Sequence, residues 1–205
     1  MSSLTHTPAA SPRSLIIACG ALVREIRDVL GANRLAGIDI AAIPALYHNR
    51  PEKIAPAVAE RIAAAGDRYE HIFVAYAECG TKGDLDRVIE AAGAERLPGT
   101  HCYAFFSGVD AFAARDDDIT SFFLTDFLVR QFDSLIMKGL GIAKHPELRD
   151  MYFGNYKKVV YISQIATPDL IAKAELAADK LGLAFEHRPV GYGDLAISLD
   201  ERFPV

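Results

Sequence analysis

The chain has 205 residues, of which 51% are hydrophobic and 24% charged, and its formal net charge is −5. This length suits one sizeable core, so we expect a flexible N-terminal tail over 1–12 and a single α/β domain over 13–205. An acidic chain without a long Lys/Arg block argues against nucleic acid or an anionic membrane as a partner. No apolar run approaches the roughly 18 to 20 residues of a membrane helix. Three cysteines, an odd number, favour a reducing cytoplasm over a disulfide framework.

Short apolar runs alternate with amphipathic stretches in the first half of the chain, which is typical of parallel strands joined by helices. Gly31 to Asn33 should end the first helix, and Pro51 should open the second. The expected elements are a strand over 15–18, a helix over 20–30, a strand over 38–43, a helix over 51–65, a strand over 71–75, a helix over 84–92 and a short strand over 96–99.

The second half continues the alternation after an aromatic-rich segment. A helix should begin within 101–112, Arg115 to Asp118 should form a solvated turn, and Asp126 should cap the helix that follows it. The remaining elements are a strand over 121–124, a helix over 127–138, a strand over 159–162, a helix over 168–181 and a strand over 184–190. Together they predict a mainly parallel open sheet flanked by helices, with Rossmann-like or flavodoxin-like layering in three α/β/α layers.

Reactive side chains gather where the predicted strands end. Ligands of open α/β sheets bind beyond the carboxyl ends of the strands, and five residues fall there: Cys19, His48, Cys79, His101 and Cys102. Thiolates and imidazole suit a soft or borderline cation, and a site assembled from separate strands needs no CxxC pairs. We therefore expect a binding site for zinc or another transition metal.

The neighbours of these residues suggest how such a site would work. Cys19 and Cys79 each precede a glycine at a strand-to-helix turn, where a helix N-terminus would favour thiolate over thiol. Polar residues after His48 would fix its tautomer. Glu78 and Tyr103 flank the ligands and are the candidate catalytic acid or base, with Tyr76 as a further hydrogen-bond donor.

Two other interpretations of the cysteines stay open. A cysteine at the end of a strand is often just a small buried hydrophobic residue. Cys79 and Cys102 would alternatively form a reversible disulfide, although a reducing compartment disfavours it. The histidines at 6, 71, 145 and 187 lie outside the strand ends, so we interpret them as structural or solvated.

The sequence resembles the bacterial and archaeal family of unknown function DUF1638. The likeness rests on four segments: Ile16 to Gly20, Tyr47 to Glu52, Tyr76 to Gly80 and Pro98 to Cys102. Relatives carry His-Asp-Cys where this chain has His101 and Cys102, so either residue of the pair remains the candidate ligand.

The resemblance implies a role rather than an activity, because the family has no established one. Genes of the family are often neighbours of those for corrinoid proteins and methyltransferases. This implies a metal-dependent enzyme or enzyme component of corrinoid-linked one-carbon metabolism, in which zinc activates a thiol or another small substrate for methyl transfer. The alternative is a non-catalytic accessory protein that holds a metal or corrinoid, or docks on a methyltransferase. Corrinoid would be bound only through a partner protein, and a homo-oligomer is compatible with either role.

Overall fold

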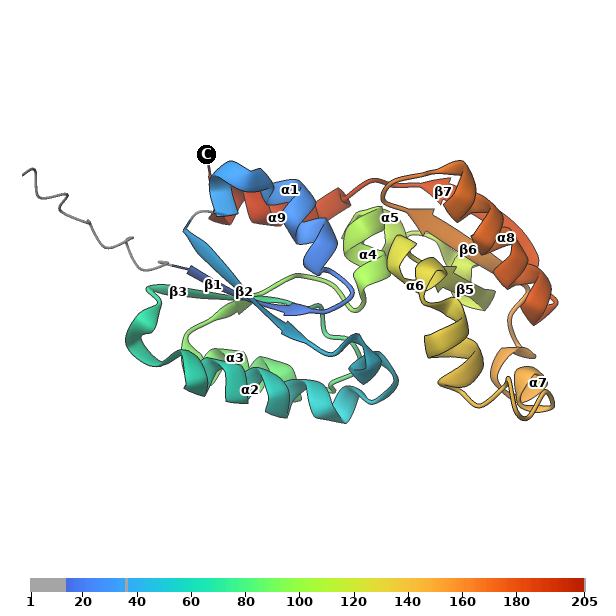
Figure 1. The fold of residues 1–205 in the computed structure, drawn as a ribbon, viewed down its shortest axis with the longest axis horizontal. Coiled ribbons are helices and arrows are strands. Elements are labelled where there is room, and N and C mark those ends of the chain that lie inside the picture. The colour runs from blue at the N-terminus through green and yellow to red at the C-terminus, as the bar shows by residue number, and fades with distance from the viewer. Residues whose placement is uncertain (1–13, 36, 205) are drawn as a thin grey trace, which may run out of the picture.

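The computed structural model describes residues 14–35 and 37–204, so the tail expected over 1–12 lies outside the described residues. The α/β class and the parallel strands are confirmed, but the strands form two sheets where one was expected (Figure 1). In spatial order, the first sheet contains β2 (Ile38–Ile43), β1 (Ser14–Cys19), β3 (His71–Ala75) and β4 (Glu95–Arg96). The second contains β5 (Ser121–Leu124), β6 (Lys158–Ser163) and β7 (Ala184–Pro189). At the edge of the first sheet, β4 pairs with β3 over two residues only, and the chain then continues to the second sheet.

Helices cover both faces of the first sheet. One face carries α1 (Val23–Leu35) and α9 (Gly193–Arg202), and the other carries α2 (Ile54–Ala65) and α3 (Asp84–Ala92) (Figure 1). Successive β1 residues point to opposite faces, so Ile16 joins the core under α1 while Ile17 joins the core under α2. The α9 helix was not expected from the sequence, and it brings the end of the chain back to the first sheet.

The second sheet is covered on one face by α6 (Asp126–Arg130), the π-helix η5 (Asp133–Lys138), α7 (Leu148–Phe153) and α8 (Pro168–Leu181). Its other face packs against α4 (Cys102–Ser107), which is followed by α5 (Val109–Ala113). Phe105 and Phe106 of α4 belong to a core cluster that also contains Ile16 of the first sheet and Val160 of the second. The two sheets therefore share one buried apolar core. None of the helices within 14–35 and 37–204 is long and apolar enough to cross a membrane.

Three local predictions in this part of the chain were wrong. Thr125, not Asp126, is the N-cap of α6, since its hydroxyl accepts a hydrogen bond from the Leu128 amide at 3.3 Å. The helix expected over 127–138 ends at Arg130 and resumes as η5. The turn expected to be solvated is the 3-10 helix η4 (Asp116–Thr120), in which Asp118 is buried.

Glycines shape two other helix boundaries. Gly31 leaves helical geometry with a φ of 64°, yet α1 resumes and runs to Leu35, beyond the end expected at this glycine. Gly108, with a φ of 83°, separates α4 from α5 where one helix was expected. The other short elements are the 3-10 helices η1 (Ala45–Asn49), η2 (Pro51–Lys53) and η3 (Gly66–Arg68).

Candidate functional site

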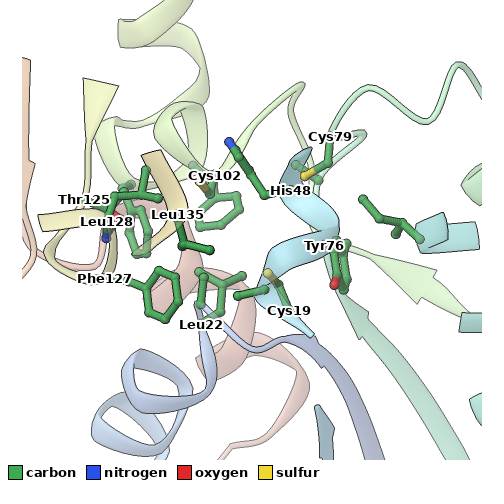
Figure 2. A pocket seen from close by; sticks show the side chains of 16 residues that line it. Cys19, Leu22, His48, Tyr76, Cys79, Cys102, Thr125, Phe127, Leu128 and Leu135 are labelled. Carbon is green, nitrogen blue, oxygen red and sulfur yellow. Dashed lines mark hydrogen bonds between the residues drawn. The ribbon is translucent and has the colours of Figure 1, made fainter. Parts of the chain in front are cut away.

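Segments that follow strands of both sheets surround one cavity (Figure 2). We call the part of the chain from β1 to α5 the first region and the part from η4 to β7 the second region. The first region provides Cys19 at the end of β1, His48 on η1, Cys79 after β3 and Cys102 at the start of α4. The second region contributes Thr125, Phe127, Leu128 and Leu135, from α6, its N-cap and η5. The structure thus brings three cysteines and one histidine together, as the strand-end argument predicts, but at the junction of two sheets.

The cavity is small and mostly apolar. Water molecules can occupy about 40 Å³ of it, and one water needs roughly 10 to 15 Å³ on this measure. Leu22, Ile54, Phe105 and Phe106 form much of its wall. There is room for an ion with a water or two, but not for the body of an organic substrate.

Cys19 is fixed by a close approach of two chain segments. The Gly20 amide donates to the Ile43 carbonyl at 2.8 Å, and a Cβ at Gly20 would lie 3.1 Å from the same oxygen. A side chain at this position would push the segments apart. Gly20 therefore allows the segment after β2, which carries His48, to lie beside Cys19.

Cys79 lies in a strained turn. Its φ is 51°, a left-handed conformation that costs a residue with a Cβ roughly 1 to 2 kcal/mol. The Cys79 amide donates to the Thr100 carbonyl at 2.8 Å, and the Glu78 amide donates to the Gly99 carbonyl at 3.1 Å. These bonds tie the turn to the segment that leads into Cys102. Such strain persists only where surrounding structure enforces it, and it concentrates at functional sites.

Glu78 uses its carboxylate to hold this turn. The carboxylate accepts hydrogen bonds from the Gly80 amide at 2.8 Å, from the Thr81 hydroxyl at 3.1 Å and from the Lys82 amide. Desolvation raises the pKa of Glu78, but these hydrogen bonds outweigh it and leave the pKa below its ordinary value. Glu78 does not line the cavity, so its placement suits a residue that positions Cys79.

His101 and Cys102 face different spaces. The exposed His101 lines a neighbouring hollow, whereas the partly buried Cys102 lines the cysteine cavity. His48 lines both spaces, and it keeps a solvent-exposed face. Desolvation, followed by the charge of His101, lowers the pKa of His48, which favours the neutral imidazole that metals bind. Tyr103 lines the hollow only and stacks on Phe123 with ring centroids 5.3 Å apart.

Burial dominates the acidity of the three free thiols. It raises the pKa of Cys79 to about 12, with a further increase from Cys19, and it raises the pKa of Cys19 and of Cys102. The charges of Cys79 and Cys19 raise the pKa of Cys102 further. Burial therefore opposes the thiolate form that a helix N-terminus was expected to favour at Cys19 and Cys79, and α1 begins only at Val23.

Tyr76 adds a polar group beside Cys19. Burial raises the pKa of its hydroxyl, and the neighbouring Cys19 raises it further. Within the described part of the chain, this buried hydroxyl has no oxygen or nitrogen that accepts or donates a hydrogen bond. The Cys19 thiol and this hydroxyl influence the pKa of one another.

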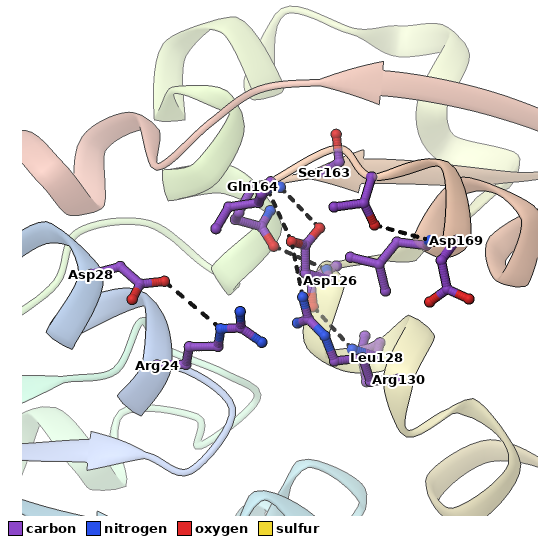
Figure 3. Close-up of polar contacts among 12 residues, drawn as sticks. Arg24, Asp28, Asp126, Leu128, Arg130, Ser163, Gln164 and Asp169 are labelled. Carbon is purple, nitrogen blue, oxygen red and sulfur yellow. Dashed lines mark hydrogen bonds and ion pairs between the residues drawn. The ribbon is translucent and has the colours of Figure 1, made fainter.

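The carboxyl end of the second sheet carries a carboxylate that the sequence argument missed. Asp126 is 1% exposed and accepts hydrogen bonds from the Gln164 amide at 3.0 Å and the Ile165 amide at 2.9 Å (Figure 3). It also accepts a hydrogen bond from the Tyr161 hydroxyl at 2.7 Å. Its own amide donates to the Gln164 side chain at 3.0 Å. Asp126 therefore fastens the start of α6 to the loop after β6.

Glu25 was missed as well, although it lies three residues after Leu22 on α1, and residues at this spacing share a helix face. It is 4% exposed, and its Oε2 atom has no hydrogen-bond partner among the described residues. Burial raises the pKa of Glu25. From the second region, the charge of Arg130 lowers this pKa and the charge of Asp126 raises it.

A comparison with known families matches residues 42–199 to a family described as a protein of unknown function, DUF1638. The matched span includes His48, Cys79, His101 and Cys102, and Cys19 precedes it. No curated protein and no solved structure matches the chain.

Proposed function

The chain belongs to the DUF1638 family, and we propose that it is a metal-binding protein whose cysteine cavity holds zinc or another transition metal. The candidate ligands are Cys19, His48, Cys79 and Cys102. Three of them bound at once would leave one position of a tetrahedral ion open for a substrate, whereas all four would close the site and make it structural. One observation carries the proposal: four soft or borderline donors from four separate segments line one small cavity.

The chemistry of these donors fits a cation. Three thiolates in an apolar cavity would repel one another, as the mutual effects on the pKa values of Cys19, Cys79 and Cys102 indicate. A transition-metal ion would compensate these charges and favour the deprotonated thiols. The neutral imidazole of His48 completes a donor set typical of zinc.

The spacing of the donors implies a movement on binding. Within 14–35 and 37–204, no three His, Cys, Asp or Glu side chains lie close enough to hold one ion as they are placed. The turn at Cys79 is the segment suited to close, because Gly80 and Gly83 with positive φ values follow the strained Cys79. Metal binding would thus compensate the strain of this turn.

The proposed role is in methyl transfer of corrinoid-linked one-carbon metabolism. When bound, a metal of this kind lowers the pKa of a coordinated thiol and presents it as a nucleophilic thiolate. The apolar wall around the cavity excludes bulk water, and the Tyr76 hydroxyl would donate a hydrogen bond to Cys19. The support for methyl transfer is the family resemblance, with corrinoid bound only by a partner protein.

Elemental analysis of the protein purified without chelator tests metal binding. We expect close to one equivalent of one transition metal in the wild type and a loss of most of it in Cys79→Ser and Cys102→Ser. His145→Ala is the matched control, because His145 is exposed and pairs only with Glu147 at 3.4 Å. Less than about a tenth of an equivalent in the wild type would overturn the proposal, since structural zinc sites bind far too tightly to lose it on purification.

Activity separates an enzyme from an accessory protein. If the protein is an enzyme, His48→Ala should lose methyl transfer to a thiol. Added metal should restore this activity in the metal-free wild type but not in the variant. A stable complex with a corrinoid protein or a methyltransferase, together with metal-loaded protein that has no transferase activity, would assign the accessory role instead.

A further inference from the structure

A larger hollow adjoins the cysteine cavity, and His48 belongs to the walls of both. The hollow extends along α4, α5 and η4 to the start of β5. Water molecules can occupy about 690 Å³ of it, against about 40 Å³ in the cavity. Sites for small organic molecules usually have volumes of roughly 300 to 1,000 Å³. The hollow therefore offers room for the body of a substrate that is acted on in the cavity.

The walls of the hollow are rich in aromatic rings. Tyr103 and Phe112 each contact Phe123 with ring centroids 5.3 Å apart, and Phe122 contacts Tyr156 at 5.7 Å. Aromatic rings pack favourably on one another in offset or edge-to-face geometry, beyond the effect of buried area alone. This wall favours a flat ring over a flexible aliphatic chain.

One polar group in the wall has no partner. Ser121 is 5% exposed and lines the hollow, and its Oγ atom makes no hydrogen bond with any residue that the structure describes. Ser121, Phe122 and Phe123, three successive residues of β5, all line the hollow. Buried hydroxyls in folded proteins nearly always have a partner, so a ligand with a polar substituent would satisfy this one.

We propose that the hollow binds an aromatic thiol, with its ring against the wall that includes Phe123, a polar ring substituent at Ser121 and its sulfur directed past His48 toward the metal. This inference rests on the proposed function and names the substrate class of that site. Arg115, Asp116 and Asp118 also line the hollow, on η4 and in the turn before it.

Calorimetric titration of zinc-loaded protein with 4-mercaptophenol tests the proposal. Ala113→Phe would fill the hollow from an exposed position on α5 and should weaken binding at least tenfold. Ala63→Phe, at an exposed position of α2 outside the hollow, is the matched control and should leave binding unchanged. Cyclohexanethiol, which lacks a flat ring, should bind about 2 to 12 times more weakly, as expected for lost ring contacts.

Ser121→Ala tests the polar end of the site. Binding of 4-mercaptophenol should weaken about 3 to 12 times through the lost hydrogen bond, while binding of benzenethiol should not change. The variant should fold normally, because it removes a hydroxyl that has no partner in the described chain. Equal effects on both thiols would contradict a contact between Ser121 and the ring substituent.

Two outcomes separate this inference from the proposed function. If the protein holds a full equivalent of zinc but Ala113→Phe binds 4-mercaptophenol as well as the wild type, the hollow is not the substrate site and the metal proposal stands. If the protein holds no metal but phenol binds to the wild type and not to Ala113→Phe, the hollow is a site for aromatic rings and the proposed thiol chemistry is wrong. A change of oligomeric state in Ala113→Phe, seen by light scattering, would instead assign the hollow to a second copy of the chain and overturn the inference.

Discussion

The carboxyl ends of the two sheets meet at one junction, but the buried polar groups at these ends differ in their hydrogen-bond partners. At the first sheet, Cys79 occupies a left-handed turn, and the buried hydroxyl of Tyr76 has no oxygen or nitrogen partner among the described residues. At the second sheet, the equally buried Asp126 receives three hydrogen bonds, two of them from the backbone after β6. Groups that are satisfied within the fold stabilise it, whereas strained and unsatisfied groups await a ligand. The comparison therefore predicts that substitutions at the second end chiefly lower stability, whereas those at the first end chiefly affect the proposed ligand binding.

The largest expected effect is on stability and comes from the second end. Asp126→Ala removes the acceptor of three buried donors, from Tyr161, Gln164 and Ile165, and should lower the free energy of unfolding by about 4 kcal/mol. Urea denaturation measures the change. Asp169→Ala is the control, because its ion pair with Lys173 is exposed and should contribute less than about 0.5 kcal/mol. A loss below about 1 kcal/mol in Asp126→Ala would contradict the conclusion that the hydrogen bonds of Asp126 stabilise the fold.

A second prediction concerns paired charges elsewhere in the second region. Arg188 binds both oxygens of the buried Asp118, at 2.7 and 3.0 Å, so Arg188→Met should cost about 2 kcal/mol at pH 7. The hydrogen bonds from Arg188 hold the pKa of Asp118 below its ordinary value. This stabilisation is complete above the unfolded pKa of about 3.9 and is lost as the pH falls through the lower folded pKa.

The difference between Arg188→Met and the wild type should therefore shrink below about pH 4, which urea denaturation at a series of pH values measures. Arg149→Met, which removes an exposed pair with Asp150, should show little effect at any pH. A difference that grew toward low pH would mean that Asp118 is not stabilised as a carboxylate.

Local sequence signals predicted much of the fold correctly. The helix over 168–181 was predicted with its observed bounds because Pro168 at its first turn and Gly182 with a positive φ mark its ends. The division into two sheets was not predictable in this way, since it depends on which strands pair with one another. The burial of Asp118 also depends on a distant residue, Arg188 of β7.

The residues of the site likewise differ in how far the sequence predicts them. The convergence of Cys19, His48, Cys79 and Cys102 follows from their positions at strand ends, which a sequence reveals. The contributions of α6 and η5 do not, because the sequence predicted one sheet and gave no reason to place a second one opposite these residues. Glu25 carried a usable signal in its helical spacing from Leu22, but its burial needs the packing of the second region.

The strain at Cys79 gives the third prediction. Cys79→Gly and Cys79→Ala both remove the thiol, but only glycine adopts a φ of 51° without steric cost. The glycine variant should therefore be more stable than the alanine variant by about 1 kcal/mol, measured by thermal or urea unfolding. At Cys102, the first residue of α4, the order should not favour glycine, because alanine is the better helix residue. Equal stabilities of the two Cys79 variants would mean that this turn is unstrained.

The smallest expected effect tests how the two ends are joined. The Asn49 side chain, next to His48, donates to the Leu135 carbonyl in η5 at 3.2 Å, and Leu135 lines the cysteine cavity. Asn49→Ala should lower the free energy of unfolding by only about 0.5 to 1 kcal/mol. Hydrogen exchange should nevertheless increase at the amides of 133–138, while those of α8 stay protected.

The control is Asn155→Ala, because Asn155 is exposed and the substitution should leave both segments unchanged. If exchange rises equally in η5 and α8 of Asn49→Ala, the hydrogen bond contributes to global stability alone. A local rise confined to η5 would instead identify Asn49 as the residue that holds this wall of the cavity against the first region. Since His48 and Asn49 share one turn of η1, a metal bound by His48 should then slow exchange in η5 as well.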